Sequence, residues 1–499
     1  MGRPGVFRAR GSLGAMVLAY APAGVIPAAV GAFSAMVFTR LLDPSQYGIV
    51  ALVLAWGGPV TVVASQWAAQ ASGRFYAEYK LQGRARVYWS AVKMCVLAGL
   101  GTSVLLCLLG GSSMFLITPA RTWILGHSWL LLGAALGVCM QVALSILLPI
   151  LPASGLALQY SMGVAGSSVM GFLVAVVGSL AFGHAMTWIV WGPVAAKALA
   201  LAYVGMTART LLKSGSGLDG RFREVWLTAR QFWHYGSPML LWFGFTSAAG
   251  VVDRYILGGF FGSAVVGAYA VTCNIAGEAV SVCGRPIISA GWPQLAQQWS
   301  HGLMQDVFET MRAMTETYLT VVVAAMSVLW FAWPLLAHLL GKGFRTDGIV
   351  VGPVAGAAAI WSLSTIGHKA LELRGRTKLL AVDAAWSALV NVVLNLGLTR
   401  YAGIEGAAIS TVGGAITYGT LIVLQTRTWP AWYVAARRLG AIVWIESVAL
   451  GVAYTARRAF SCEGSLGQLL QVGAFVACYA LLTMWWITRE RRRVTRAVQ

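Results

Sequence analysis

The sequence predicts an all-α polytopic membrane protein of about 14 transmembrane helices, with both ends of the chain on the cytoplasmic side. Of its 499 residues, 58% are hydrophobic and 10% are charged, whereas about a quarter of the residues in a soluble domain are charged. Apolar runs of about 18 or more residues recur between short polar breaks, which is long enough to cross ~30 Å as a helix. A β-barrel would instead show alternating segments of about ten residues. Because a helix satisfies its own backbone hydrogen bonds, it is the structure expected for such runs in lipid.

The apolar runs give the expected position of each transmembrane helix, in chain order. The expected spans are residues 13–39, 46–70, 88–110, 123–148, 161–182, 188–208, 238–260, 265–289, 313–341, 349–372, 379–400, 407–425, 439–456 and 467–488.

The orientation follows from where the basic residues lie between these spans. The two tails and the even-numbered breaks hold 24 Lys and Arg residues, the odd-numbered breaks hold about seven, and five lie within spans. Cytoplasmic loops carry the excess of positive charge in membrane proteins. The distribution therefore predicts that both ends lie in the cytoplasm.

The sequence also argues against a nucleic-acid partner and against a metal site. A net charge of +20 would suggest nucleic acid in a soluble protein, but here the basic residues mark alternate breaks and form no groove lined with aromatic residues. The seven cysteines have no CxxC spacing and no histidine spacing typical of zinc. We therefore expect no nucleic-acid partner and no metal site.

Weak internal repetition predicts two pseudo-symmetric six-helix lobes and an appended helix pair. Gly11-Ser12 opens the first span and Tyr47-Gly48 the second, while Gly236-Ser237 opens the seventh and Val266-Gly267 the eighth. The expected division is residues 1–208 for the first lobe, 209–237 for a cytoplasmic linker with an amphipathic surface helix, 238–425 for the second lobe, and 426–499 for the last two helices with a basic cytoplasmic tail.

Two stretches resemble the polysaccharide flippases of the multidrug/oligosaccharidyl-lipid/polysaccharide exporter (MOP) superfamily. Residues 38–52 (FTRLLDPSQYGIVAL) and 72–79 (SGRFYAEY) are similar to the start of that family, although Asp43 stands where glycine is more usual. Pro238, residues 253–258 (DRYILG) and residues 266–271 (VGAYAV) are similar to the start of the family's second lobe. These motifs are structural, so they indicate the superfamily better than its cargo.

The resemblance implies two six-helix bundles around a central cavity that moves a polyprenyl-pyrophosphate-linked oligosaccharide by alternating access. The expected function is export of a repeat unit from the cytoplasmic to the outer leaflet of the bacterial inner membrane, for O-antigen, capsule or exopolysaccharide synthesis. The partners would be an undecaprenyl-pyrophosphate-linked glycan, membrane lipids and other polysaccharide-assembly proteins. We expect no cofactor beyond a coupling ion, H⁺ or Na⁺, since the sequence contains no P-loop.

Two other functions stay open at this point. An ion-coupled multidrug or cation antiporter of the same superfamily would need a cavity dominated by carboxylates and aromatic residues. A membrane polysaccharide polymerase or ligase would need catalytic polar residues on a large outer loop, and the outer breaks of this sequence are short. No catalytic residue is therefore assigned, and we expect that the protein is not an enzyme.

Ionisable side chains inside the spans are the candidate functional residues, because each costs about 2.5–3.5 kcal/mol on insertion scales. They would line a wet cavity, in which cations hold the pyrophosphate and carboxylates take part in coupling; alternatively, they form internal ion pairs that join helices. Asn274, Glu278, Ser281 and Arg285 are spaced at i, i+4, i+7 and i+11, which places all four on one face of the eighth span. The candidate cavity cations are Lys197, Arg254, Arg285, Lys369 and Lys93, and the candidate coupling or cavity polar residues are Asp253, Glu278, Asn274, Asn391 and Asn395.

Some of these residues also have a simpler interpretation. Lys93, Lys369 and Glu372 lie near the expected cytoplasmic boundary, where long side chains reach the interface. Asn391 and Asn395 lie one turn apart and are as suited to hydrogen bonds between helices as to ligand contact. The expected helix-bend residues are Pro22, Pro27, Pro59 and Pro193, since proline removes a backbone donor; a static kink is the alternative.

Overall fold

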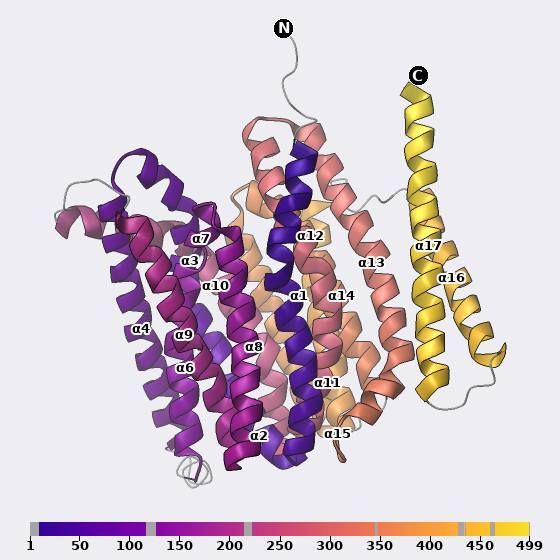
Figure 1. Cartoon of the computed structure of the whole chain (residues 1–499), viewed down its shortest axis with the longest axis horizontal. Coiled ribbons are helices and arrows are strands. Elements are labelled where there is room, and N and C mark those ends of the chain that lie inside the picture. Colours follow the sequence, from indigo (N-terminus) through magenta and orange to yellow (C-terminus); the bar gives the residue numbers. More distant parts are fainter. Residues whose placement is uncertain are drawn as a thin grey trace. The chain divides into compact units, whose positions relative to one another are not determined.

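The computed structural model describes the backbone of residues 9–115, 126–213, 222–344, 348–427, 434, 436–459 and 465–498. Every regular element that these residues form is a helix (Figure 1). The helices are α1 (Ala9–Leu41), α2 (Pro44–Ala55), α3 (Gly57–Leu81), α4 (Ala85–Phe115), α6 (Ser128–Leu147), α7 (Ile150–Ala153), α8 (Ala157–Phe182), α9 (Ala185–Lys213), α10 (Phe222–Phe261), α11 (Ser263–Thr272), a π-helix η1 (Cys273–Gly277), α12 (Glu278–Ser300), α13 (Met304–Leu339), α14 (Gly348–Leu373), α15 (Thr377–Thr426), α16 (Ala436–Ala459) and α17 (Ser465–Val498).

Within the described residues, 12 continuous helical stretches are long and apolar enough to cross a membrane. The chain is therefore a multi-pass helical membrane protein, as the composition predicts. The difference from 14 has two sources. The expected spans 379–400 and 407–425 both lie in α15, which bends at Gly403, where φ is 53°. α10 is not among the 12, because Asp253, Arg254 and its Trp and Tyr residues lower its mean hydropathy.

The helices pack into two compact units. The first contains residues 1–271 and 376–410, and the second contains residues 272–375 and 411–499. α10 belongs to the first unit because it packs along α3 and α4. The expected lobe boundaries at residues 208, 238 and 425 stay a prediction, as does the orientation of the two ends.

The predicted surface helix is part of a longer element. α10 runs for 40 residues from Phe222, through Pro238, to Phe261, so the expected surface helix and the seventh span form one helix. The Ser-Gly segment of the predicted linker, residues 214–221, lies outside the described residues. Phe232 of α10 stacks on Phe75 of α3 at 5.5 Å, and the Tyr79 hydroxyl donates to Gln231 Oε1 at 2.8 Å.

The departure at Asp43 from the family motif has a local cause. Asp43 is the N-cap of α2: its carboxylate accepts the backbone N–H of Gln46 at 2.9 Å, and the Gln46 side chain accepts the Asp43 N–H at 3.3 Å. Pro44 follows at the first helical position, where a missing N–H costs nothing. The turn before α2 is thus a complete capping box.

The first unit brings two of the repeated glycine motifs into contact. A Cβ added to Gly48 of α2 would lie 1.7 Å from the Ser263 carbonyl oxygen, and one added to Gly267 of α11 would lie 2.2 Å from the Pro44 carbonyl oxygen. The hydroxyls of Ser45 and Ser263 lie 2.7 Å apart at the same crossing. Small residues allow such close approach of backbones in membrane helices. The glycines found as a sequence repeat therefore form the contact between α2 and α11.

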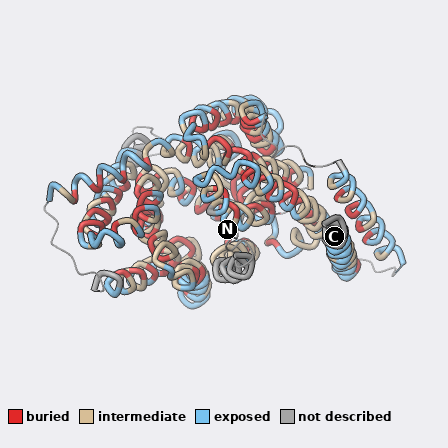
Figure 2. The backbone as a smooth tube through the Cα atoms, turned by 90° about the horizontal axis from the view of Figure 1, so that it is seen from above, coloured by how far each residue is buried: buried red, intermediate tan, exposed pale blue. Residues whose placement is uncertain are grey.

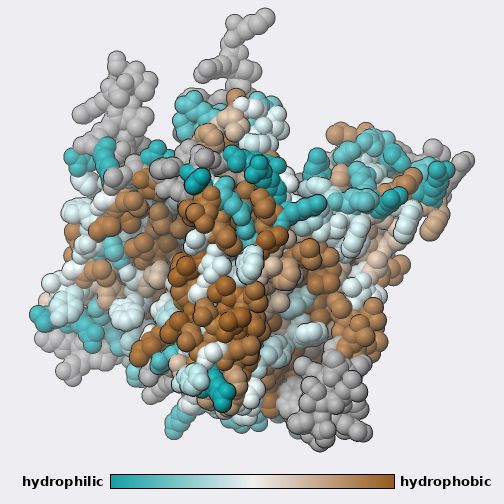
Figure 3. Space-filling model, turned by 180° about the vertical axis from the view of Figure 1, so that it is seen from behind, coloured by the Kyte–Doolittle hydropathy of each residue, from teal (hydrophilic) through white to brown (hydrophobic). Residues whose placement is uncertain are grey.

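In the second unit the last helix pair packs against α13. Glu316 of α13 lies 3.1 Å from both Arg312 and Arg438, so it connects α13 to α16. The Tyr479 hydroxyl of α17 donates to the Thr320 carbonyl at 2.6 Å. Figure 2 shows buried residues on helix faces turned towards neighbouring helices, with exposed residues on the outer faces. In Figure 3, apolar residues cover the middle of the face that is seen, and hydrophilic residues lie towards both its upper and its lower edge.

Candidate functional site

Lys197 is the most unusual of the candidate cations. It lies near the middle of α9 and is half-buried. Among the described residues, no carboxylate lies within ion-pair distance of its ammonium group, unlike Arg285 and Lys369. A lone charge inside a membrane span needs water or an anion from elsewhere. The role of Lys197 as a cavity cation stays a prediction.

α9, the helix that carries Lys197, packs closely on α6. A Cβ on Gly133 of α6 would meet Val190 and Trp191, and one on Gly137 would meet Val194. Residue numbers rise together on the two helices from one contact to the next, so α6 and α9 run parallel here.

Asp253 and Arg254 lie on α10 in the first unit. The Asp253 carboxylate is 6% exposed and accepts hydrogen bonds from the Tyr269 hydroxyl at 2.7 Å and from the Arg254 backbone N–H at 2.8 Å. The Tyr255 hydroxyl donates to the Leu52 carbonyl at 3.0 Å. These bonds connect α10 to α11 and α2. The observed geometry gives Asp253 a structural contact, and its role in coupling stays a prediction.

Glu278 and Arg285 form an ion pair on one face of α12. Arg285 Nη2 lies 2.6 Å from Glu278 Oε2, and both side chains are about half exposed. Asn274 precedes them in the π-helix η1, so its spacing to Glu278 is not that of a regular α-helix. The pair lies within one helix and does not join two helices. The sequence offers no signal for the π turn, which often occurs at functional positions.

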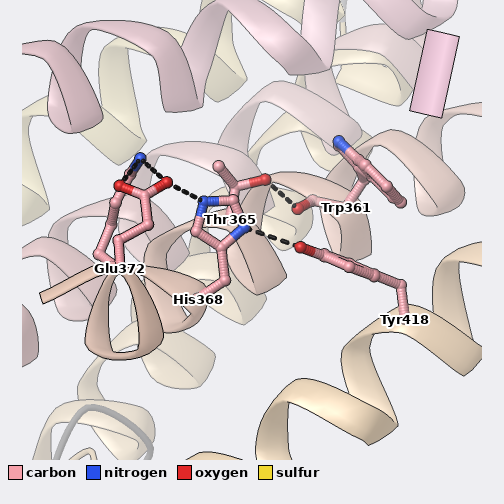
Figure 4. Close-up of polar contacts among 6 residues, drawn as sticks. Trp361, Thr365, His368, Glu372 and Tyr418 are labelled. Carbon is pink, nitrogen blue, oxygen red and sulfur yellow. Dashed lines mark hydrogen bonds and ion pairs between the residues drawn. The ribbon is translucent and has the colours of Figure 1, made fainter. Parts of the chain in front are cut away.

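Figure 4 shows a polar cluster near the end of α14 in the second unit, with His368, Glu372 and Tyr418 labelled. Lys369 pairs with Glu372 of this cluster. Its ammonium donates to both Glu372 oxygens, at 2.8 and 2.9 Å, and lies 4.7 Å from the centre of the Trp292 ring. The buried His368 places Nε2 3.1 Å from Glu372 Oε1, while Nδ1 lies 2.8 Å from the Tyr418 hydroxyl. Lys369 is thus neutralised within the protein, which makes it a weaker candidate for binding an anion.

Sequence reasoning placed Glu372 at the interface and missed its partners. The spacing of Lys369 and His368 three and four residues before Glu372 is the signal that could have found the cluster. Tyr418 and Trp361, whose rings stack at 4.5 Å, come from helices far apart in the chain. Their contact could not be read from spacing.

Glu372→Gln is expected to destabilise the folded protein, because it leaves Lys369 unpaired in a site where both side chains are 13% exposed. Removing one partner of a buried pair costs about 3–5 kcal/mol. The measurement is the unfolding temperature of purified protein in detergent. Glu224→Gln is the matched control: Glu224 pairs with Arg84 at 3.4 Å and both are nearly half exposed, so the cost should stay below about 1 kcal/mol. Equal shifts in unfolding temperature for the two variants would contradict the stabilising role of the buried pair of Lys369 and Glu372.

The remaining candidates are separate from these groups. Lys93 is exposed on α4. Asn391 and Asn395 are buried in α15, where the Thr399 hydroxyl donates to Asn395 Oδ1 at 2.6 Å. Asn391 Oδ1 and Asn395 Nδ2 have no hydrogen-bond partner in the part of the chain that the structure describes. Such atoms are where a water or an ion would bind.

The four prolines occupy two kinds of position. Pro22 and Pro27 lie inside α1, and Pro193 lies inside α9. Pro59 lies in the first turn of α3, because the second span is divided into α2 and α3 at Trp56. Proline is tolerated in a first turn, whose N–H groups have no helical acceptor. Whether these helices bend during a transport cycle stays a prediction.

Comparisons with known proteins agree with this architecture. No protein-family model matches the chain. It is 26% identical over 176 residues to the probable low-salt glycan biosynthesis flippase Agl15 of Haloferax volcanii. The match covers 35% of this chain and 36% of that protein, so the chain spans about a third of its relative's length in this match.

Solved structures match over most of the chain. The lipid II flippase MurJ, in an inward closed conformation, has a TM-score of 0.70 at 12% identity and covers 94% of this chain and 99% of its own. An inward-facing MATE-family multidrug resistance transporter of the MOP superfamily has a TM-score of 0.54 at 12% identity, and the match covers 84% of this chain and 94% of its own. The Vibrio cholerae MATE transporter VcmN has a TM-score of 0.54 at 14% identity, and the match covers 85% of this chain and 100% of its own.

The resemblance predicted from the motifs is therefore confirmed at the level of the fold and of a partial homology. The chain has the helical membrane fold shared by MurJ and the MATE transporters of the MOP superfamily, and about a third of it is homologous to a glycan biosynthesis flippase.

Proposed function

We propose that the protein is a flippase that moves a polyprenyl-pyrophosphate-linked oligosaccharide from the cytoplasmic to the outer leaflet by alternating access. The observation that carries the proposal is Lys197, a half-buried cation in the middle of a membrane helix, without a carboxylate partner among the described residues. An ammonium at this depth suits a diphosphate, which carries negative charge through the membrane. The names of the relatives, a glycan biosynthesis flippase and a lipid II flippase, support the same cargo class.

A membrane potential, negative inside, would favour outward movement of the cargo. The gain is about 2.3 kcal/mol per charge per 100 mV. A coupling ion, H⁺ or Na⁺, is part of the proposal, and the unpaired amide oxygen of Asn391 is an acceptor that suits a cation. We assign the protein to the inner membrane of a bacterium, with an undecaprenyl carrier lipid and polysaccharide-assembly proteins as partners; the relative with the partial match is archaeal.

A multidrug or cation antiporter is the second candidate, because MATE transporters share the fold. That function needs a carboxylate facing the cargo. Here Asp253 is held by Tyr269, and Glu278 is neutralised by Arg285. The contacts of these carboxylates favour an anionic cargo over a cationic one.

The test uses purified protein in vesicles that contain the lipid-linked glycan which accumulates when the protein is depleted from cells. We expect the glycan to become accessible to a membrane-impermeant reagent on the opposite face, and to remain chemically unchanged. A covalent change in the glycan would indicate a polymerase or ligase. Uptake of cationic dyes, with no movement of the glycan, would indicate the antiporter. If no lipid-linked glycan accumulates on depletion, the proposal is wrong.

A further inference from the structure

A cavity of about 490 Å³ lies among α3, α6 and α8 in the first unit. This volume is within the range of small-ligand pockets, about 300–1,000 Å³. Its polar lining consists of Gln66 and Gln70 from α3, Gln141 and Ser145 from α6, and Tyr160 from α8. None of the described residues that line it carries a charge.

The chemistry of this lining suits one class of ligand. Each glutamine amide offers an acceptor oxygen and two donor hydrogens, and the hydroxyls of serine and tyrosine act as both donor and acceptor. A sugar hydroxyl has the same dual character, whereas a pyrophosphate requires cations and a hydrophobic drug requires a mainly apolar lining. Leu148 and Val164 supply apolar surface at the edge of the cavity.

The polar residues of the cavity lie in pairs along two of its helices. Gln66 and Gln70 are one turn apart on α3, and Gln141 and Ser145 are one turn apart on α6, so each pair presents one face. The spacing of the two helices is fixed nearby, where the Ser72 hydroxyl donates to the Ile146 carbonyl at 2.8 Å. Amide side chains inside membrane spans are costly unless they have a polar partner.

The cavity is also placed for a substrate that has both a glycan and a diphosphate. Gln141 lies on α6 and Lys197 on α9, two helices of the first unit that pack against each other at Gly133 and Gly137. The cavity lies towards the end of α3 that the predicted orientation places at the cytoplasmic face. A lipid-linked glycan enters the transport cycle from that side.

We propose that this glutamine-lined cavity is a saccharide subsite that binds the neutral sugars of the cargo while Lys197 holds its diphosphate. This inference rests on the proposed function and deepens it, since it divides recognition between two groups. It predicts that the protein senses the length or identity of the glycan through Gln66, Gln70 and Gln141. Removing these amides should slow transport of a long glycan and leave a trimmed one unaffected.

The test compares two substrates in vesicles: the lipid-linked glycan that accumulates on depletion, and the same lipid trimmed by glycosidases to its lipid-proximal sugar. The Gln66→Leu/Gln141→Leu variant is expected to move the intact glycan about tenfold more slowly than wild type, the loss typical of one or two neutral hydrogen bonds. Its rate with the trimmed lipid should equal that of wild type. Gln82→Leu, at an exposed position just beyond α3, is the control and should change neither rate.

The outcomes separate this inference from the proposed function. If wild type moves neither lipid, the proposed function fails. If wild type moves both lipids and the variant slows both equally, or slows neither, the saccharide subsite is wrong. Unfolding temperatures identify a misfolded variant; in that case Gln66→Asn and Gln141→Asn, which shorten each amide, should still slow the intact glycan more than the trimmed one, and equal slowing would overturn the proposal.

Discussion

Gly48→Leu is expected to prevent the protein from accumulating in a folded form. Even the first added carbon would lie 1.7 Å from the Ser263 carbonyl oxygen, which is far inside contact distance. The obstacle is backbone, so no change of rotamer can relieve it, and α2 and α11 must separate. Overpacking a core costs typically about 1–3 kcal/mol, and here separation also breaks the 2.7 Å contact between Ser45 and Ser263. We expect a loss at or above the upper end of that range.

The measurement is the yield of monodisperse protein after detergent extraction, together with its unfolding temperature. Gly267→Leu should behave in the same way, because its added carbon would lie 2.2 Å from the Pro44 carbonyl oxygen. Gly259→Ala on α10 is the control, since nothing lies within 4 Å of an added Cβ there. Alanine improves helix propensity by about 1 kcal/mol over glycine, so the control should be unchanged or more stable. Normal yield and stability of Gly48→Leu would show that α2 and α11 do not pack as described.

Lys197→Gln is expected to lower glycan transport by about 10- to 100-fold, because a hydrogen bond to a charged group contributes about 1.5–3 kcal/mol. The amount of folded Lys197→Gln protein should equal or exceed that of wild type. The substitution removes a charge whose insertion into the membrane costs about 2.5–3.5 kcal/mol. Lys197→Arg keeps the charge and should retain more transport than Lys197→Gln.

The measurement is the rate at which lipid-linked glycan changes leaflet in vesicles, normalised to the amount of protein. Lys378→Gln is the control, since Lys378 is exposed at the start of α15 and should not affect the rate. A Lys197→Gln protein that transports as fast as wild type would remove the main support for an anionic cargo. A variant with reduced transport and equally reduced stability would mean that Lys197 is structural.

Local sequence signals predicted much of the architecture. The apolar runs gave the helices, and the boundary between α2 and α3 falls at Trp56, three residues before the expected bend at Pro59. The turn at residues 38–48 was recognised as a family motif, and the structure explains it as a capping box at Asp43. These features depend on neighbouring residues in the chain, so hydropathy and turn chemistry are enough to find them.

The candidate site was predicted less completely. Lys197 and Glu278 stood out because charge is rare in apolar spans, and that signal needs no structure. Only the structure shows which of the two charges is paired. Glu278 has a partner on its own helix, 2.6 Å away, whereas Lys197 has no carboxylate partner among the described residues. The glutamine cavity was missed, because single uncharged residues on three helices give no periodic signal.

The sequence by itself determined that this protein is a helical membrane protein with a few charges in its spans, since hydropathy over 20 residues decides whether a segment enters lipid. Only the tertiary structure decided which charges are neutralised, that Gly48 and Gly267 allow α2 and α11 to touch, and that three glutamines share one cavity. The physical reason is that these properties depend on how helices distant in sequence pack and in which register. Lipid-facing hydropathy constrains that packing only weakly, because the lipid is as apolar as the side chains it would replace.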